Sequence, residues 1–168
     1  MQKKNGFTLV ELLIVLGILA IVATLAAVAV GAARSKQRDA TRISNVRQLQ
    51  SALEDYFNET NSYPSGTRLA LGDASLSACL GSSGFQGDCS GDRSVIMRVV
   101  LGTYQKGLEG LVACGEPSRN AFCYLQRLEG VDYSIEFELE NGLPPAGLVS
   151  GINCATPDGM KGGSCPAM

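Results

Sequence analysis

The sequence has 168 residues, six cysteines and no histidine, and its formal net charge is −2. Without histidine it cannot build a Ser-His or Cys-His nucleophile pair, and no paired carboxylates stand beside a recognisable nucleophile, so we do not expect an enzyme. Residues 59–168 carry seven basic and twelve acidic side chains. This acidic balance disfavours a nucleic-acid partner, and the glycine-rich segments match neither phosphate-binding motif, so we expect no cofactor.

The first feature along the chain is an apolar tract that follows a short basic leader. Residues 12–33 form this tract, and none of its side chains is charged. Because about 20 apolar residues in a helix cross the hydrocarbon core of a bilayer, the tract predicts a membrane-spanning helix. An ordinary secretory signal fits less well, since its apolar region is shorter and a cleavage site follows it.

Glu11 stands at the beginning of the tract, where an ionised side chain is unfavourable in a bilayer. Two interpretations are open. In the first, Glu11 lies at the headgroup level of an ordinary membrane anchor. In the second, it meets a cation that another chain supplies.

The leader and the tract together resemble the class III signal of type IV pilins and type II secretion pseudopilins. The residues that carry the resemblance are Lys3, Lys4, Asn5, Gly6, Phe7, Thr8, Leu9, Val10 and Glu11. It implies that prepilin peptidase cuts between Gly6 and Phe7 and methylates the new amino terminus. It also implies that the Phe7 ammonium of one subunit pairs with the Glu11 carboxylate of its neighbour, which would offset the cost of burying both charges.

The same resemblance implies a single-pass membrane protein that later enters an extracellular or periplasmic filament. Its partners would be further copies of itself in a helical homo-oligomer, prepilin peptidase, an inner-membrane platform protein and an assembly ATPase. We expect a subunit of a type IV pilus-like filament for adhesion, motility or uptake. A type II secretion pseudopilin and a monomeric, single-span surface protein are the alternatives.

Residues 7–58 are predicted to form one helix, in which an amphipathic half, 34–58, follows the membrane-spanning half, 7–33. Apolar residues in the second half recur every three or four positions, at Ala40, Ile43, Val46, Leu49, Leu53 and Tyr56 or Phe57. This spacing predicts one buried face. We expect the basic residues Arg34, Lys36, Arg38 and Arg47 to remain in water.

Two features of the spanning half bear on how it would pack. Small residues recur at every fourth position, at Ala23, Ala27 and Gly31 and again at Ala29 and Ala33. Such rows allow helix backbones to approach closely, although they also suit the ordinary composition of a membrane helix. Where many pilins carry a helix-weakening proline, this chain has Val28, so we expect a more continuous helix.

Residues 59–168 are predicted to form an extracytoplasmic globular domain of the α+β class, in which the long helix packs on a small, disulfide-braced antiparallel sheet. The clearest strand is 133–140, where Tyr133, Ile135, Phe137 and Leu139 alternate with Ser134, Glu136, Glu138 and Glu140, so that one face is buried and one is acidic. Further strands are expected at 68–71, 122–128 and 143–149. Residues 95–104 fit a strand or a short helix, and the remainder of 65–92 is expected to be irregular.

All six cysteines lie beyond the tract. They allow 15 disulfide connectivities, but their clustering favours bridges between neighbours in the sequence. The pairs are Cys79–Cys89, Cys114–Cys123 and Cys154–Cys165, and the last resembles the disulfide-bounded terminal loop of many pilins. Disulfides imply an oxidising compartment, although the basic residues that follow the tract would by themselves place the domain in the cytoplasm.

Four aspartates in expected loops are weak candidates for calcium ligands. They are Asp73, Asp88, Asp92 and Asp158. Their spacing matches no EF-hand, and solvated turn residues are the commoner outcome, so we expect no metal site.

Overall fold

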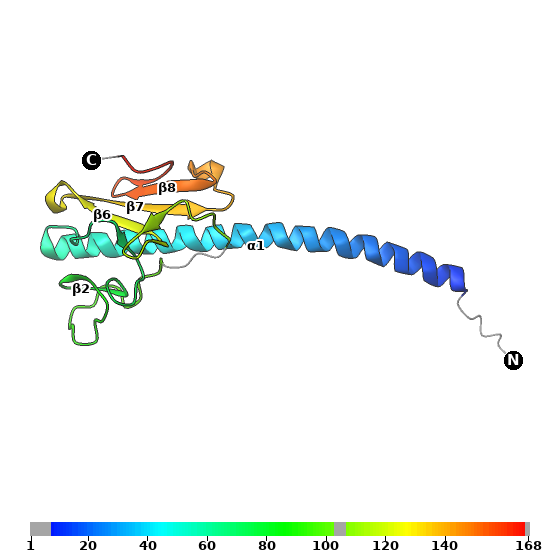
Figure 1. Cartoon of the computed structure of the whole chain (residues 1–168), viewed down its shortest axis with the longest axis horizontal. Coiled ribbons are helices and arrows are strands. Elements are labelled where there is room, and N and C mark those ends of the chain that lie inside the picture. The colour runs from blue at the N-terminus through cyan, green and yellow to red at the C-terminus, as the bar shows by residue number, and fades with distance from the viewer. Residues whose placement is uncertain (1–7, 103–106, 167–168) are drawn as a thin grey trace. The chain divides into compact units, whose positions relative to one another are not determined.

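Figure 1 shows the computed structural model of the chain, which describes residues 8–102 and 107–166. The chain divides into two compact units, Met1–Gln37 and Arg38–Met168. Helix α1 extends from Leu9 to Thr60 without an interruption in its assignment, so the predicted single helix is confirmed and ends two residues later than expected. The α+β layout of a long helix, an antiparallel sheet and disulfides is also confirmed.

In the second unit, a five-stranded antiparallel sheet packs on the carboxyl-terminal half of α1 (Figure 1). Its strand order is β1-β6-β7-β8-β9. The bounds are Leu69–Ala70 for β1, Cys123–Arg127 for β6, Asp132–Leu139 for β7, Gly151–Thr156 for β8 and Gly159–Gly162 for β9. Two small hairpins complete the unit, one of β2 (Cys79–Gly81) and β3 (Gly84–Gln86), the other of β4 (Ala113–Cys114) and β5 (Arg119–Asn120). Short 3-10 turns occupy Leu128–Gly130 and Pro144–Ala146.

The main core lies between one face of α1 and the inner face of the sheet. The predicted alternation in β7 is confirmed, because its four large apolar side chains are buried, as are five from the helix: Tyr133, Ile135, Phe137 and Leu139 from the strand, and Ile43, Val46, Leu49, Leu53 and Tyr56 from α1. Full burial of an aliphatic or aromatic side chain of this size contributes about 1.5–3 kcal/mol. This contact therefore holds the second unit together.

At the beginning of the second unit, the predicted helix face is wrong. Ala40 is exposed, whereas Asp39 and Arg42 are buried at 3% exposure each. Arg38, which was expected to remain in water, is half-buried. Charged residues replace apolar ones here because they meet a partner from the sheet, Glu140.

Arg38, Asp39, Arg42 and Glu140 form one ion network, in which Arg38 is half-buried and the other three are largely shielded from water. Arg42 Nη1 lies 2.8 Å from Asp39 Oδ1 and 2.8 Å from Glu140 Oε1. Arg38 donates to both carboxylate oxygens of Glu140, at 2.7 and 2.5 Å. Asp39 in turn accepts the backbone N–H groups of Glu140 and Asn141 at 2.8 and 2.7 Å. The network fastens the end of β7 to α1 with every charge matched by an opposite one.

This network should make the protein sensitive to acid. Hydrogen bonds from Arg38, and then those from Arg42, lower the pKa of Glu140 below its ordinary value. A carboxyl group whose pKa is lower in the folded state contributes fully to the stability of the fold above its unfolded pKa, about 4.3 for glutamate. The fold loses this contribution as the pH falls from there through the folded pKa. We expect urea denaturation to give a lower free energy of unfolding below about pH 4, and a shallower acid dependence in Glu140→Gln. Equal pH slopes for the two proteins would contradict this expectation.

The outer face of β7 is acidic, as predicted, but much of it is enclosed. Glu138 is buried, and its carboxylate accepts three backbone N–H groups, from Glu109, Gly110 and Leu111, at 2.7, 3.1 and 2.8 Å. Glu136 accepts the N–H of Cys165 at 3.0 Å. A second apolar cluster also covers this side, made of Ala70, Val112, Cys114, Ala121 and Cys123. The acids of β7 therefore serve as anchors for flanking chain segments.

Several strands lie at other positions than those predicted. Residues 65–92 contain the β2–β3 hairpin, and within 95–102 the backbone makes an isolated bridge between Met97 and Leu80 in place of a strand or helix. Residues 143–149 form a turn closed by a Leu143–Leu148 bridge, because Pro144 and Pro145 interrupt pairing. The last two strands, β8 and β9, occupy much of the segment from Cys154 to Cys165, where a terminal loop was expected.

The structure contains three disulfides, Cys79–Cys89, Cys114–Cys123 and Cys154–Cys165. Their partners are 10, 9 and 11 residues apart in the sequence. In the chain-entropy treatment, closing loops of this size contributes about 2–3 kcal/mol each. Each bridge ties a strand residue, Cys79 of β2, Cys114 of β4 or Cys154 of β8, to a segment nearby in the sequence.

Candidate functional site

The beginning of α1 is built by two side chains that cap each other. Thr8 donates its backbone N–H to Glu11 Oε2 at 2.8 Å, and the Glu11 N–H donates to Thr8 Oγ1 at 3.3 Å. The Thr8 hydroxyl also donates to Glu11 Oε2 at 2.9 Å. This reciprocal arrangement is a capping box, which satisfies N–H groups that a helix otherwise leaves unpaired.

The capping box occupies only one oxygen of the Glu11 carboxylate. All the hydrogen bonds that Glu11 accepts from Thr8 go to Oε2. Among the residues that the structure describes, Oε1 has no hydrogen-bond partner, and the side chain is exposed. The carboxylate can therefore accept a further donor without giving up its role in the helix cap.

The apolar tract is a fully uncovered surface. Its large side chains are all exposed, from 47% for Val15 to 68% for Leu25 and 74% for Val28. Among the described residues, α1 is the one helix that is long and apolar enough to cross a membrane. An exposed apolar surface of this length is not stable in water, so it needs either lipid or other helices around it.

The small-residue rows lie on this same surface. Gly17 and Gly31 have no atom of another segment within 4 Å of the position where a Cβ would stand. Ala23, Ala27 and Ala33 are likewise exposed. The rows are therefore free to receive another helix, although the described chain itself supplies none.

One comparison identifies this amino-terminal segment. Residues 1–27 match the prokaryotic N-terminal methylation motif. The chain begins with the class III signal of type IV pilins. No curated protein and no solved structure matches the chain. The predicted resemblance to the class III signal is thus confirmed. The matched motif is a structural one of the pilin type and not an enzymatic one.

The pilin signal has direct consequences for processing and location. It implies cleavage by prepilin peptidase and assembly into a filament. Together with the exposed apolar helix, it indicates that the protein is anchored in a membrane before assembly. Gly6 and Phe7, the residues between which cleavage is expected, lie outside the described residues.

The structure does not bring the four candidate calcium ligands together into one site. Asp73 forms an ion pair with Arg119 at 2.5 Å, Asp88 accepts hydrogen bonds from Ser90, and Asp92 accepts them from Ser82 and Ser94. Asp158 is exposed in the turn between β8 and β9. Among the described residues, no group of three or more histidine, cysteine, aspartate or glutamate side chains could hold a metal ion.

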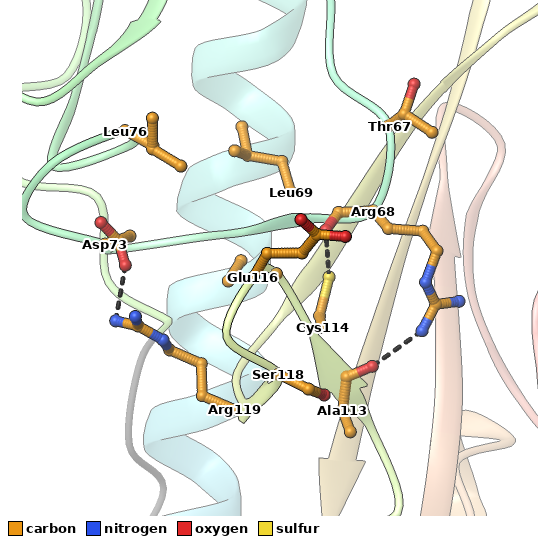
Figure 2. A pocket seen from close by; sticks show the side chains of 12 residues that line it. Thr67, Arg68, Leu69, Asp73, Leu76, Ala113, Cys114, Glu116, Ser118 and Arg119 are labelled. Atoms are coloured by element: carbon orange, nitrogen blue, oxygen red, sulfur yellow. Dashed lines mark hydrogen bonds and ion pairs between the residues drawn. The ribbon is translucent and has the colours of Figure 1, made fainter.

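A cavity of about 640 Å³ lies beside β1 and the β4–β5 hairpin (Figure 2). The Asp73–Arg119 ion pair lies at one side of it. Arg68 donates to the carbonyl oxygen of Ala113 at 2.8 Å. Three of the charged side chains in this lining, Asp73, Arg119 and Arg68, are thus engaged with one another or with the backbone, whereas Glu116 is exposed. The described lining offers no nucleophile beside a base.

The sequence contains the signal for the capping box, but this motif was not predicted from it. Thr8-Leu9-Val10-Glu11 has the spacing of that motif, a threonine followed three residues later by a glutamate at the beginning of an apolar run. The acid therefore has one role within its own chain, which the sequence interpretation did not consider. Any role toward a second chain is additional to it.

Proposed function

We propose that this protein is a structural subunit of a type IV pilus-like helical filament. Residues 1–6 are removed by cleavage between Gly6 and Phe7, and Phe7 is methylated. Residues 7–33 then form the filament core and 34–58 the amphipathic half of the helix, while 59–168 form the extracytoplasmic globular domain. Glu11 of each arriving subunit pairs with the Phe7 ammonium of a neighbour.

The observation that carries this proposal is the free oxygen of an already capped carboxylate. Glu11 Oε2 is held by Thr8, and Oε1 is unpaired among the described residues. Cleavage after Gly6 leaves the Thr8 N–H as an ordinary amide, so the capping box survives processing. A carboxylate fixed in this way is already oriented for a charge-assisted hydrogen bond to an ammonium, which is stronger than a neutral one.

Filament assembly also supplies a partner for the apolar surface. Outside the membrane, the side chains of 12–33 can avoid water only by packing against the same segments of other subunits. The small-residue rows at Ala23, Ala27 and Gly31 favour close approach of such helices. An anchor that remained in lipid throughout would need neither the rows nor the processing signal.

In the proposed pathway, the subunit is stored in the membrane as a single-pass protein and then extracted by a platform protein and an assembly ATPase. The three disulfides favour an oxidising compartment for the globular domain, which supports a location outside the cytoplasm, although the basic residues after the tract favour the opposite side. The finished filament is extracellular or periplasmic. Adhesion, motility and uptake are the functions that such a surface filament serves.

Electron microscopy of sheared cell surfaces tests this proposal. We expect abundant filaments that bind antibodies raised against residues 107–166. Short filaments that form only on overexpression and remain in the periplasm would instead indicate a type II secretion pseudopilin. Protein that is released only by detergent, without filaments, would indicate a monomeric surface anchor and overturn the proposal.

A further inference from the structure

The turn after β7 contains a dipeptide whose side chain can react with its own backbone. Asn141–Gly142 follows Leu139, the last residue of β7, and Asn141 is exposed. In an Asn-Gly pair no side chain shields the glycine nitrogen, so this nitrogen can reach the asparagine side chain and displace its amide. The sequence has one other such pair, Asn5–Gly6, in the leader. The described part of the chain thus offers one site for this chemistry.

The backbone of the turn requires the glycine. Gly142 has a φ of 73°, in the left-handed region that side chains rarely adopt. A Cβ at this position would lie 2.5 Å from the carbonyl carbon of Val149 and 2.7 Å from the nitrogen of Ser150. Any larger residue would force these segments apart. The fold itself therefore keeps an unshielded nitrogen next to Asn141.

The two groups that must meet are both available. Among the described residues, the Gly142 N–H has no hydrogen-bond partner. The Asn141 amide nitrogen makes one hydrogen bond, of 3.2 Å, to Asp39 Oδ2. The Asn141 backbone N–H donates to the same oxygen over a shorter distance, 2.7 Å. Because that backbone N–H is not part of the ring that forms, the residue can stay anchored while its side chain turns toward Gly142.

The reaction needs no reagent other than water. The Gly142 nitrogen loses its proton and attacks Cγ of Asn141, so that a C–N bond forms there and the bond from Cγ to the amide nitrogen breaks. The departing nitrogen takes up the proton and leaves as ammonia. Water then opens the five-membered imide at either carbonyl. One opening gives aspartate and the other gives isoaspartate, whose main chain is one methylene longer, and no atom is oxidised or reduced.

The product carboxylate would form beside an acid of the ion network. At present Arg38 and Arg42 balance Asp39 and Glu140. A carboxylate at position 141 would replace the amide that now donates to Asp39 Oδ2, so a hydrogen-bond donor would give way to a like charge. Asp39 is 3% exposed, so water cannot readily take the place of the lost donor. The longer main chain of isoaspartate would also draw the N–H of position 141 away from Asp39.

We propose that Asn141–Gly142 is a deamidation site and that its reaction detaches the end of β7 from Asp39 of α1. Because the displaced ammonia does not return, the modified form accumulates with the age of the protein. All the contacts involved lie within the second unit, Arg38–Met168. The inference requires no filament and is independent of the proposed function.

Peptide mapping by mass spectrometry tests this proposal on the full-length protein in detergent at mildly alkaline pH. Asn61–Ser62, an exposed asparagine followed by a residue with a side chain, is the internal control. We expect position 141 to exchange NH2 for OH at least about ten times faster than Asn61, because glycine leaves the attacking nitrogen open. Isoaspartate should be present among the products. Asn141→Gln keeps a side-chain amide but would need a six-membered ring, so it should not react.

Urea denaturation of the same samples measures the consequence. We expect the modified fraction to unfold at a urea concentration about 1 M lower, since a hydrogen bond to a buried charge is lost. Asn141→Asp should have the lower midpoint from the beginning, and Asn141→Gln should keep a constant one. A position 141 that reacts no faster than Asn61 would overturn the proposal. Modification without a change in midpoint would also overturn it, because β7 would then have stayed attached. Filament formation, measured separately, bears on the proposed function alone.

Discussion

A Glu11→Gln protein should be cleaved and methylated normally and yet form no filaments. Glutamine can still accept hydrogen bonds from Thr8, since both glutamate and glutamine serve at this position of a capping box. It carries no charge, however, and cannot neutralise the Phe7 ammonium of a neighbour. Glu11→Ala should fail in the same way. Immunoblots for the cleaved form and electron microscopy of sheared surfaces measure the two outcomes separately.

This substitution separates the two roles of Glu11. If Glu11→Gln assembled as well as the wild type while Glu11→Ala did not, capping alone would explain the glutamate and the pairing role would be wrong. Thr8→Ala is the reciprocal control. It weakens the helix cap by about 1 kcal/mol but keeps the carboxylate, so filaments should still form.

Arg42→Ala should be the most damaging single change in the globular unit. Arg42 is 3% exposed and contacts both Asp39 and Glu140. Its loss leaves Asp39 buried and without its cation, and breaking a buried ion pair from one side typically costs 3–5 kcal/mol, so we expect a loss of about that size. Urea denaturation of the full-length protein in detergent, followed by near-ultraviolet circular dichroism, measures the effect.

Arg47→Ala is the matched control for this prediction. Arg47 lies on the same helix, five residues later, but its side chain is exposed. Its removal should change the free energy of unfolding by less than about 0.5 kcal/mol, as is usual for surface positions. Equal effects of the two substitutions would show that the buried network contributes nothing specific to stability.

The sequence predicts the helix well because its signals are local. The apolar tract, the three-to-four spacing at Ile43, Val46 and Leu49, and the absence of proline before Pro64 all describe one continuous element. The structure has that element, from Leu9 to Thr60. The strict alternation in β7 is equally local, and it is present as predicted.

The buried charges could not be predicted in the same way. Asp39 and Arg42 look like solvent-facing residues until Glu140, about a hundred residues later, is brought beside them. The acids at Glu136 and Glu138 likewise look solvated until distant backbone amides meet them. Pairing over such separations depends on the tertiary fold, and no periodicity in the sequence reports it.

The carboxyl-terminal strands were missed for a different reason. Pro144 and Pro145 place the turn where a strand was expected, and the pairing resumes at Gly151 in β8. Short strands rich in glycine, such as Gly159–Gly162, have weak local signals. They form here because β8 pairs with β7 and β9 pairs with β8.

The intact mass of the native protein tests the central claim most directly. A filament subunit that carries the pilin signal should lack residues 1–6, carry one additional methyl group on Phe7, and have six fewer hydrogens because its six cysteines are oxidised. A mass that retains the first six residues and carries no methyl group, in protein that never polymerises, would contradict the proposed function.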